Sequence, residues 1–191
     1  MIKNSLTFQF LKNPFSVGAV CPSSPELAQE ISSFAGLENA SSIAELGPGT
    51  GALTGAILNK KAPEACFFAI ELNLSVLEVF RKKFPSVKVY NESAANLADI
   101  ARRENLTKVD SVISGLPWAA FPSALQDELL SAISSSLSEE GCFSTFSYLH
   151  CPLLPAGKRF REKLSRYFTR VETSSIVWKN VPPAFVYRCR K

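Results

Sequence analysis

Two acids and three glycines in the first half of the chain have the types and spacing to bind a nucleotide-like ligand. Gly47, Gly49 and Gly51 alternate with other residues after a short apolar run. Because glycine has no Cβ, such a backbone can turn tightly and approach a ligand closely. Glu45 lies two residues before the first glycine, and Glu71 lies 20 residues beyond the last. The segment after the glycines is expected to start a helix, whose first N–H groups would face the ligand.

Two kinds of cofactor fit this loop. The spacing Gly47-x-Gly49-x-x-Ala52, with Glu71 as a ribose-binding acid, satisfies the dinucleotide fingerprint. The run from Glu45 to Gly51, Glu-Leu-Gly-Pro-Gly-Thr-Gly, also resembles the first motif of the class I methyltransferases, which bind S-adenosyl-L-methionine (SAM). About forty residues precede the loop, whereas a dinucleotide domain usually begins at its first strand. The acid before the glycines and this leading segment favour SAM; a glycine turn without a ligand is the plain alternative.

Alternating strand and helix patterns surround the loop. Continuous apolar runs such as 66–70 are typical of strands buried on both faces of a parallel sheet. We expect strands at 43–46, 66–71, 87–90, 109–114 and 141–148, and helices at 53–58, 74–84, 95–104 and 122–137, after a first helix capped by Ser24-Pro25. A basic helix at 158–167 then precedes strands at 171–178 and 184–189, whose short joint predicts an antiparallel hairpin.

These elements predict one α/β domain spanning residues 1–191. Repeated strand–helix alternation with short connections is typical of a doubly wound sheet. A parallel sheet that ends on a hairpin is the class I methyltransferase pattern, which weakens the dinucleotide hypothesis. The predicted fold is Rossmann-like: a seven-stranded, mostly parallel sheet with a C-terminal antiparallel hairpin and helices on both faces.

In open α/β sheets the ligand lies beyond the carboxyl ends of the strands, so we take the candidate residues from those ends. The candidates for cofactor binding are Glu45, Gly47, Gly49, Thr50, Gly51, Glu71, Leu72, Ser93, Ala94 and Gly115. Within this set Glu71 would accept hydrogen bonds from the ribose hydroxyls, and Ser93-Ala94 would lie beside adenine.

Residues after the fourth and fifth strands are the candidates for the reaction itself. Leu116, Pro117 and Trp118 are expected at the substrate, where a transferred methyl group would emerge. Tyr148 and His150 are the candidate catalytic bases, because an amine acceptor must lose its proton before it attacks. Core packing is the alternative role for Trp118 and Tyr148, and a structural role is the alternative for His150.

Composition excludes several classes of protein. The 191 residues are 46% hydrophobic and 20% charged, which suits one globular domain. No apolar stretch is long enough to span a membrane, and the N-terminus lacks a signal-peptide pattern. Five cysteines without a C-x-x-C pair and a single histidine predict reduced thiols and no metal site. We therefore expect a cytoplasmic protein.

Basic residues concentrate at the two ends of the chain. Residues 158–191 contain ten Lys or Arg and two acids, whereas residues 19–157 contain nine bases and fifteen acids. Residues 1–20 combine Lys3 and Lys12 with a dense apolar set. The pattern indicates an anionic partner, either nucleic acid or a lipid surface. Segment 1–40 would then be a helical lid or a membrane-docking segment; an ordinary solvated basic face is the alternative.

The tetrapeptide after the fourth strand allows a comparison with methyltransferases that act on adenine. Ribosomal RNA adenine dimethylases have Asn-Leu-Pro-Tyr there, with the amide accepting a hydrogen bond from the planar amine. This chain has Gly115-Leu116-Pro117-Trp118, so the amide acceptor is missing. The difference argues against a flat aromatic amine as the acceptor.

The chain more closely resembles the bacterial phospholipid N-methyltransferases, which methylate phosphatidylethanolamine. The matching pieces are Gly18-Ala19-Val20-Cys21-Pro22-Ser23-Ser24, Glu45–Gly51, Ser114-Gly115-Leu116-Pro117 and Asn180–Arg188. Tyr148 also matches, although residues 149–157 depart from the expected Tyr-Gly-x-x-x-Pro run.

The resemblance implies a SAM-dependent N-methyltransferase that acts on a lipid amine at the inner membrane face, docked by its N-terminal helix. An RNA adenine methyltransferase and a membrane- or RNA-binding module without catalysis are the alternatives.

Overall fold

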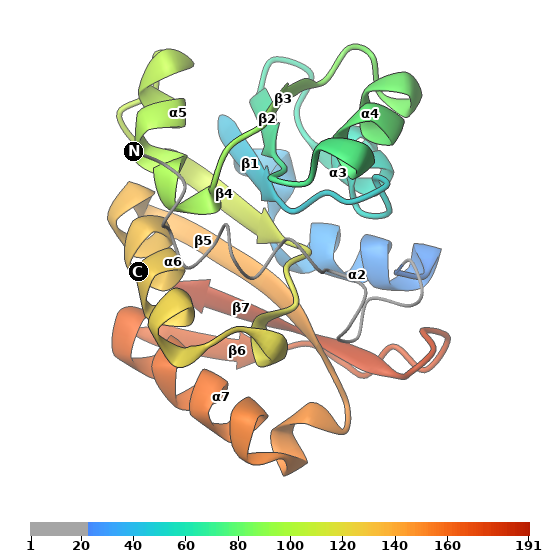
Figure 1. Ribbon diagram of the computed structural model, residues 1–191, viewed down its shortest axis with the longest axis vertical. Coiled ribbons are helices and arrows are strands. Elements are labelled where there is room, and N and C mark those ends of the chain that lie inside the picture. Colours follow the sequence, from blue (N-terminus) through green and yellow to red (C-terminus); the bar gives the residue numbers. More distant parts are fainter. Residues whose placement is uncertain (1–22) are drawn as a thin grey trace.

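A single seven-stranded sheet organises the protein (Figure 1). The computed structural model describes residues 23–191. The strands are β1 (Ser42–Leu46), β2 (Cys66–Ile70), β3 (Lys88–Tyr90), β4 (Val109–Ser114), β5 (Leu137–Tyr148), β6 (Arg170–Thr173) and β7 (Ala184–Arg190). Their order is β3-β2-β1-β4-β5-β7-β6. β7 is antiparallel to both of its neighbours, and the other pairs are parallel.

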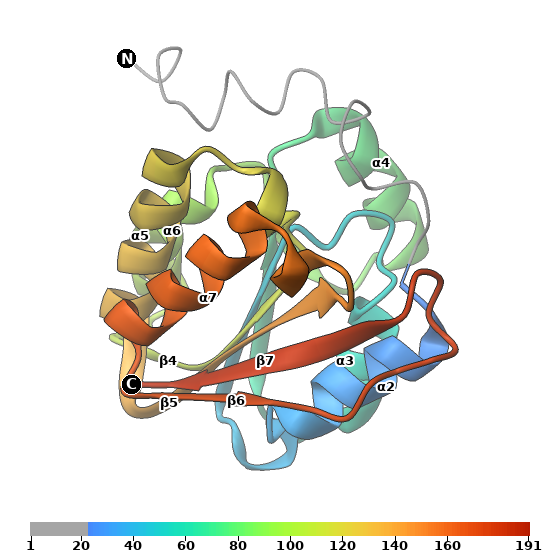
Figure 2. The same cartoon turned by 90° about the horizontal axis from the view of Figure 1, so that it is seen from below.

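Helices cover both faces of the sheet (Figure 2). One face carries α2 (Pro25–Phe34), α3 (Thr54–Lys60) and α4 (Leu74–Lys83), and the other carries α5 (Leu97–Arg103), α6 (Ser123–Ser136) and α7 (Pro155–Tyr167). Residues 23–191 also contain four 3-10 turns: η2 (Leu37–Asn39), η3 (Ala94–Asn96), η4 (Trp118–Ala120) and η5 (Cys151–Leu153). All five residues of β1 are buried, as expected for a strand apolar on both sides. The predicted fold class is therefore confirmed.

Local capping places two of the helices where the sequence predicts them. The Ser24 hydroxyl accepts a hydrogen bond from the Leu27 N–H at 3.1 Å, and Pro25 occupies the first turn of α2. The Asn73 side chain accepts from the N–H groups of Ser75 and Val76 at the start of α4. These caps satisfy N–H groups that have no partner inside the helix.

Three predicted boundaries are wrong. β5 begins at Leu137, four residues early, because Leu137 pairs with Val109 and a register shift carries the polar residues 138–140 along the strand. α7 begins at Pro155 instead of 158, since proline is well suited to a first helical turn. β6 ends at Thr173 instead of Trp178, and residues 174–183 form a loop with one isolated bridge between Val177 and Ala184.

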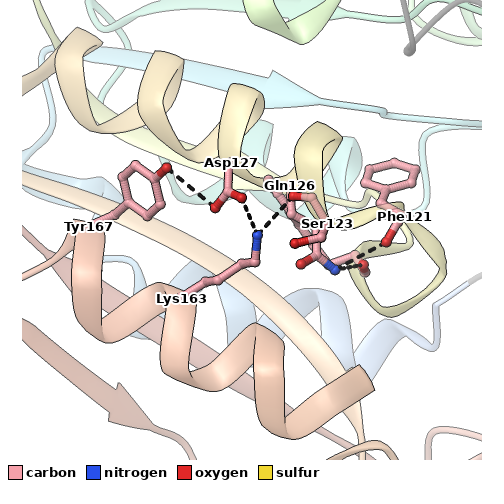
Figure 3. Close-up of polar contacts among 7 residues, drawn as sticks. Phe121, Ser123, Gln126, Asp127, Lys163 and Tyr167 are labelled. Atoms are coloured by element: carbon pink, nitrogen blue, oxygen red, sulfur yellow. Dashed lines mark hydrogen bonds and ion pairs between the residues drawn. The ribbon is translucent and has the colours of Figure 1, made fainter. Parts of the chain in front are cut away.

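Buried polar contacts fix α6 against α7 and against the turn that follows β4 (Figure 3). Lys163 is 6% exposed, and its ammonium donates to the Ser123 carbonyl at 2.8 Å and pairs with Asp127. Next to Asp127 on α6, the buried Gln126 amide donates to the Trp118 carbonyl at 2.7 Å. A buried ammonium needs such partners, because an unpaired charge in the interior is costly. The contacts hold η4, which follows β4, and the middle of α7 in fixed positions against α6.

Part of the predicted lid or docking segment belongs to the core. Leu27 and Ile31 of α2 are fully buried against the sheet. The apolar, lysine-bearing stretch within residues 1–20 lies outside the described residues. Within 23–191, no helix has the length and apolarity needed to cross a bilayer. The same residues contain no cluster of three potential metal ligands.

Candidate active site

Backbone hydrogen bonds continue past the ends of the central strands and align the candidate residues. The Gly47 N–H donates to the Ile70 carbonyl at 2.9 Å, and the Gly115 N–H donates to the Leu46 carbonyl at 2.9 Å. One strand further out, the Glu71 N–H donates to the Tyr90 carbonyl at 3.0 Å. The glycine loop, Glu71 and Gly115 therefore meet at one edge of the sheet. Strand order reverses between β1 and β4, which is where ligands bind in such sheets.

The three glycines of the loop adopt a conformation that other residues rarely reach. Gly47, Gly49 and Gly51 have φ values of 65°, 58° and 80°. A Cβ at Gly47 would lie 2.5 Å from the Leu116 side chain, and one at Gly51 would lie 2.1 Å from the Phe84 ring. A Cβ at Gly49 would meet nothing within 4 Å. Gly47 and Gly51 thus serve close packing, whereas Gly49 leaves open space beside the loop. Thr50 is exposed at the tip.

The carboxylate of Glu71 joins the glycine loop to the end of β2. Its Oε2 accepts a hydrogen bond from the Gly49 N–H at 3.2 Å, and its Oε1 accepts from the Asn73 N–H at 2.8 Å. Burial raises the pKa of this carboxyl, and the hydrogen bonds from the backbone of Asn73, Gly49 and Leu72 oppose that rise. The acid predicted 20 residues beyond the loop is therefore held against it. Leu72, the next residue, is half-buried.

Glu45 is an acid in the middle of the core. It is 0% exposed on β1, and its Oε2 accepts a hydrogen bond from the Thr54 hydroxyl at 2.7 Å. Its Oε1 is buried without a partner among the described residues. Burial raises the pKa of Glu45 to about 8, partly offset by the Thr54 hydrogen bond and increased by the nearby Glu71 charge. An unpartnered buried carboxylate oxygen is rare, and it favours a cationic or donor group from outside the described residues.

The loop after β3 is short and hydrogen-bonded. The Ser93 hydroxyl accepts from the Ala95 N–H at 3.2 Å and caps η3, and Ala94 is buried at 9% exposure. Asn91 donates from its amide to the carbonyls of Glu71 at 2.9 Å and Leu72 at 3.0 Å. The small residues predicted to lie beside adenine therefore stand on a loop that is tied to the end of β2.

The tetrapeptide after β4 divides between the surface and the core. Gly115 and Leu116 are half-buried and Pro117 is exposed. A Cβ at Gly115 would lie 2.7 Å from the Gly47 carbonyl oxygen, so glycine is needed for this close approach of two loops. Trp118 is 3% exposed, and its indole N–H donates to the Ser114 hydroxyl at 3.0 Å.

The Trp118 ring is packed on several sides. It stacks on Phe160 of α7 with ring centroids 5.2 Å apart and meets Phe143 edge-on at 5.7 Å. These contacts place the ring in the core between β5 and α7. Trp118 therefore has the packing role that the sequence left as its alternative, while Leu116 and Pro117 remain at the surface of the site.

Tyr148 and His150 lie together at the end of β5. Their rings are parallel within 4°, with centroids 5.9 Å apart. Tyr148 is half-buried against the cluster that includes α2, and it meets Phe146 edge-on at 5.8 Å. His150 is exposed. The two candidate bases therefore form one aromatic pair at the edge of the sheet that also carries the glycine loop.

Three residues of the site were not predicted. Thr54 is the hydrogen-bond donor to Glu45, Phe84 fills the space behind Gly51, and Asn91 ties two loops together. The first could be anticipated, since a buried carboxyl needs a hydrogen-bond donor and the Thr54 hydroxyl follows the glycine turn. The other two depend on tertiary packing, for which the sequence offers no spacing rule.

Comparison with known proteins agrees with this geometry. No protein-family profile matches the chain. One curated relative, the ornithine lipid N-methyltransferase of Singulisphaera acidiphila, is 26% identical over 185 residues, covering 95% of this chain and 92% of its own.

Several solved structures with the same fold are methyltransferases. A precorrin-6y C5,15-methyltransferase from Geobacter metallireducens has a TM-score of 0.67 at 17% identity, covering 94% of this chain and 95% of its own. An O-methyltransferase from Bacillus cereus, solved with SAH, has a TM-score of 0.70 at 12% identity. The match covers 96% of this chain and 86% of the O-methyltransferase. With its strand order and C-terminal antiparallel hairpin, this chain has the Rossmann-like fold of the class I methyltransferases.

Proposed function

We propose that this protein is a SAM-dependent N-methyltransferase whose acceptor is the headgroup amine of a lipid. The observation that carries the proposal is the pair of buried acids at the glycine loop. Glu71 is hydrogen-bonded to the Gly49 N–H, and Glu45 has a buried oxygen without a partner in the described chain. Two buried carboxyls that converge on an open glycine turn are unfavourable for packing alone, and they suit a ligand that carries both hydroxyls and a cation.

The residues present fit SAM. The Glu45 carboxylate suits the cationic amino group of the cofactor, because that pairing satisfies Oε1 and offsets the burial of the charge. Glu71 suits the ribose hydroxyls, and Ser93-Ala94 suit the edge and face of adenine. The open side of Gly49 lets the backbone approach the cofactor closely, with Gly47, Thr50 and Gly51 shaping the turn.

The chemistry requires little covalent help from the chain. The sulfonium of SAM supplies an activated methyl group, so the protein must orient the acceptor amine and exclude water. Leu116 and Pro117, beside Gly115, offer an apolar wall for this purpose. The amine must lose its proton before attack, and the Tyr148–His150 pair is our candidate to accept it.

A lipid amine is favoured over an aromatic amine by two observations. The curated relative is an ornithine lipid N-methyltransferase that covers nearly the whole chain. Gly115 stands where adenine methyltransferases place an amide acceptor, and its contact with the Gly47 carbonyl leaves no room for a larger side chain. Phosphatidylethanolamine and ornithine lipids both present a primary amine, and we propose an acceptor of this class. The RNA alternative relied on the basic C-terminal residues, of which Lys163 is buried in an ion pair.

Replacement of Glu45 by glutamine should change how stability depends on pH. Its pKa in the folded protein, about 8, lies above 4.5, the ordinary value for a glutamate, so the stability that it contributes is present below pH 4.5 and is lost as pH rises toward 8. Wild-type protein without cofactor should therefore lose about 2 kcal/mol of unfolding free energy between pH 6 and pH 8 relative to Glu45→Gln. Urea denaturation at several pH values measures the difference, and parallel curves for the two proteins would contradict it.

A matched pair of glycine substitutions tests the cofactor loop. Gly49 and Gly36 both have positive φ, 58° and 70°, and both have open space where a Cβ would lie. Each change to alanine should cost about 1 kcal/mol of stability through backbone strain. Only Gly49→Ala should weaken SAM binding, by about tenfold or more, because its Cβ occupies the cofactor side of the loop. Calorimetric titration gives both affinities; equal affinities would remove Gly49 from the cofactor site.

Transfer of a radiolabelled methyl group from SAM identifies the acceptor class. The purified protein is offered mixed liposomes and total RNA together, and the products are then extracted with organic solvent. We expect label in the organic phase, where chromatography identifies the headgroup. Label that stays with the RNA would refute the lipid proposal, and absence of label with SAM still bound would point to another amine.

A further inference from the structure

The described residues expose seven large apolar side chains, and five of them lie on two segments at one edge of the sheet. Leu153 and Leu154 are 78% and 50% exposed after β5. Ile176, Trp178 and Val181 are 37%, 67% and 77% exposed between β6 and β7. We call segments 149–154 and 174–183 the rim. Scattered exposed apolar residues are ordinary, but a group beside a candidate active site favours a partner surface.

The two segments of the rim are neighbours in space. Tyr148, the last residue of β5, pairs with Ala184, the first residue of β7. Beyond that pair the Leu149 N–H donates to the Pro183 carbonyl at 2.8 Å, so the segments leave the sheet side by side. Figures 1 and 2 show the turn before α7 and the β6–β7 loop at the edge where β5 ends. The Tyr148–His150 pair lies at the base of this rim.

Internal hydrogen bonds hold the loop of the rim in one shape and direct its apolar side chains outward. Asn180 is 3% exposed; its side-chain oxygen accepts from the Ser24 N–H at 2.9 Å, and its amide donates to the Pro182 carbonyl at 2.7 Å. The buried Asn180 leaves Trp178 and Val181, two residues before it and one after, exposed to solvent. Because satisfied buried hydrogen bonds rigidify the chain around them, Asn180 holds the exposed Trp178 and Val181 in place.

The turn before α7 is equally well fixed. The Leu153 N–H donates to the His150 carbonyl at 3.1 Å, and the Leu154 N–H donates to the Cys151 carbonyl at 2.9 Å. A Cβ at Gly157 would lie 2.0 Å from the Cys151 carbonyl oxygen, so this turn packs tightly on the first turn of α7. Leu153 and Leu154 are therefore presented on a rigid support.

The charge around the rim is positive. Lys158 and Arg159 are exposed in the first turns of α7, and Lys179 is exposed within the loop. The sequence contains no acid between Glu140 and Glu162 and none after Glu172. The Lys179 ammonium pairs with Glu26 of α2 at 3.5 Å. Exposed Trp and Leu beside basic residues match the headgroup boundary of a bilayer, where apolar tips insert and cations meet anionic lipid.

We propose that the rim is a docking surface for an anionic lipid bilayer, which brings the candidate active site to the headgroup layer. The inference rests on the proposed lipid substrate, since docking here would let a headgroup amine reach Tyr148 and His150 while its acyl chains stay in the bilayer. It assigns membrane contact to residues 149–154 and 174–183, separately from any contact made by residues 1–22.

The two tryptophans allow a direct test, because Trp118 is 3% exposed and Trp178 is 67% exposed. Full-length protein is mixed with vesicles of equal parts phosphatidylcholine and phosphatidylglycerol, with or without brominated acyl chains. We expect bromolipid to quench wild-type fluorescence, and Trp178→Phe to remove the quenching while Trp118 still emits. Higher salt should weaken the binding. Vesicle binding without quenching of Trp178 would overturn the proposal.

The same substitution, valine to serine, at a position inside the rim and at one outside it provides a control for vesicle binding. Val181 of the rim and Val79 of α4 are both exposed, at 77% and 50%. Val181→Ser should weaken vesicle binding about fivefold, the effect of withdrawing most of a valine side chain from an apolar environment, and Val79→Ser should not. Equal losses would overturn the proposal. So would a concentration-dependent dimer in sedimentation that Val181→Ser dissociates, with no vesicle binding, because the rim would then be an interface between two copies.

A second assay separates this inference from the proposed function. Methyl transfer to lipid dispersed in detergent does not require docking, so Val181→Ser should retain the wild-type rate there and lose rate on vesicles. Transfer in detergent with no insertion of Trp178 would overturn the docking proposal alone. Insertion of Trp178 with no transfer to any lipid would support docking and refute the proposed function.

Discussion

Parallel pairing of β1 with both β2 and β4 is the constraint on which the rest of the site depends. Because hydrogen bonds continue one residue past each strand, Gly47 is tied to Ile70 and Gly115 is tied to Leu46. The two loops then approach so closely that a Cβ at Gly115 would lie 2.7 Å from the Gly47 carbonyl. This packing holds the glycine turn, Glu71 and the Gly115 loop at one edge, where a cofactor and an acceptor can meet.

Stability and function conflict at Glu45. A fully buried acid with one oxygen that has no partner within residues 23–191 is unfavourable without a ligand, and an apolar residue of similar size would suit the core better. Its position next to the glycine turn suits a charge that is used when a cation binds. The burial of Glu71 is less unfavourable than that of Glu45, because the backbone N–H groups of Gly49 and Asn73 donate hydrogen bonds to its oxygens without any ligand.

Patterning in the sequence was enough to predict the sheet, its hairpin and the residues at each strand end. Apolar runs and capping residues such as Asn73 are local signals, and the structure follows them. The predicted strand boundaries were wrong where pairing with other strands overrides the local polarity of the sequence. The polar residues 138–140 lie on β5, and the apolar residues 176–178 lie in a loop. The role of Trp118 could not be predicted either. A tryptophan after a strand gives the same sequence pattern whether its ring faces a pocket or, as here, stacks on Phe160.

The most direct test of the central claim is calorimetric titration of SAM at pH 7 in two buffers with different ionisation enthalpies. If the cofactor's cation pairs with Glu45, whose pKa without ligand is about 8, binding should release close to one proton, and Glu45→Gln should abolish that release. Binding without proton release, or with the same release from the variant, would contradict the assignment of Glu45. Absence of SAM binding would contradict the account of the whole site.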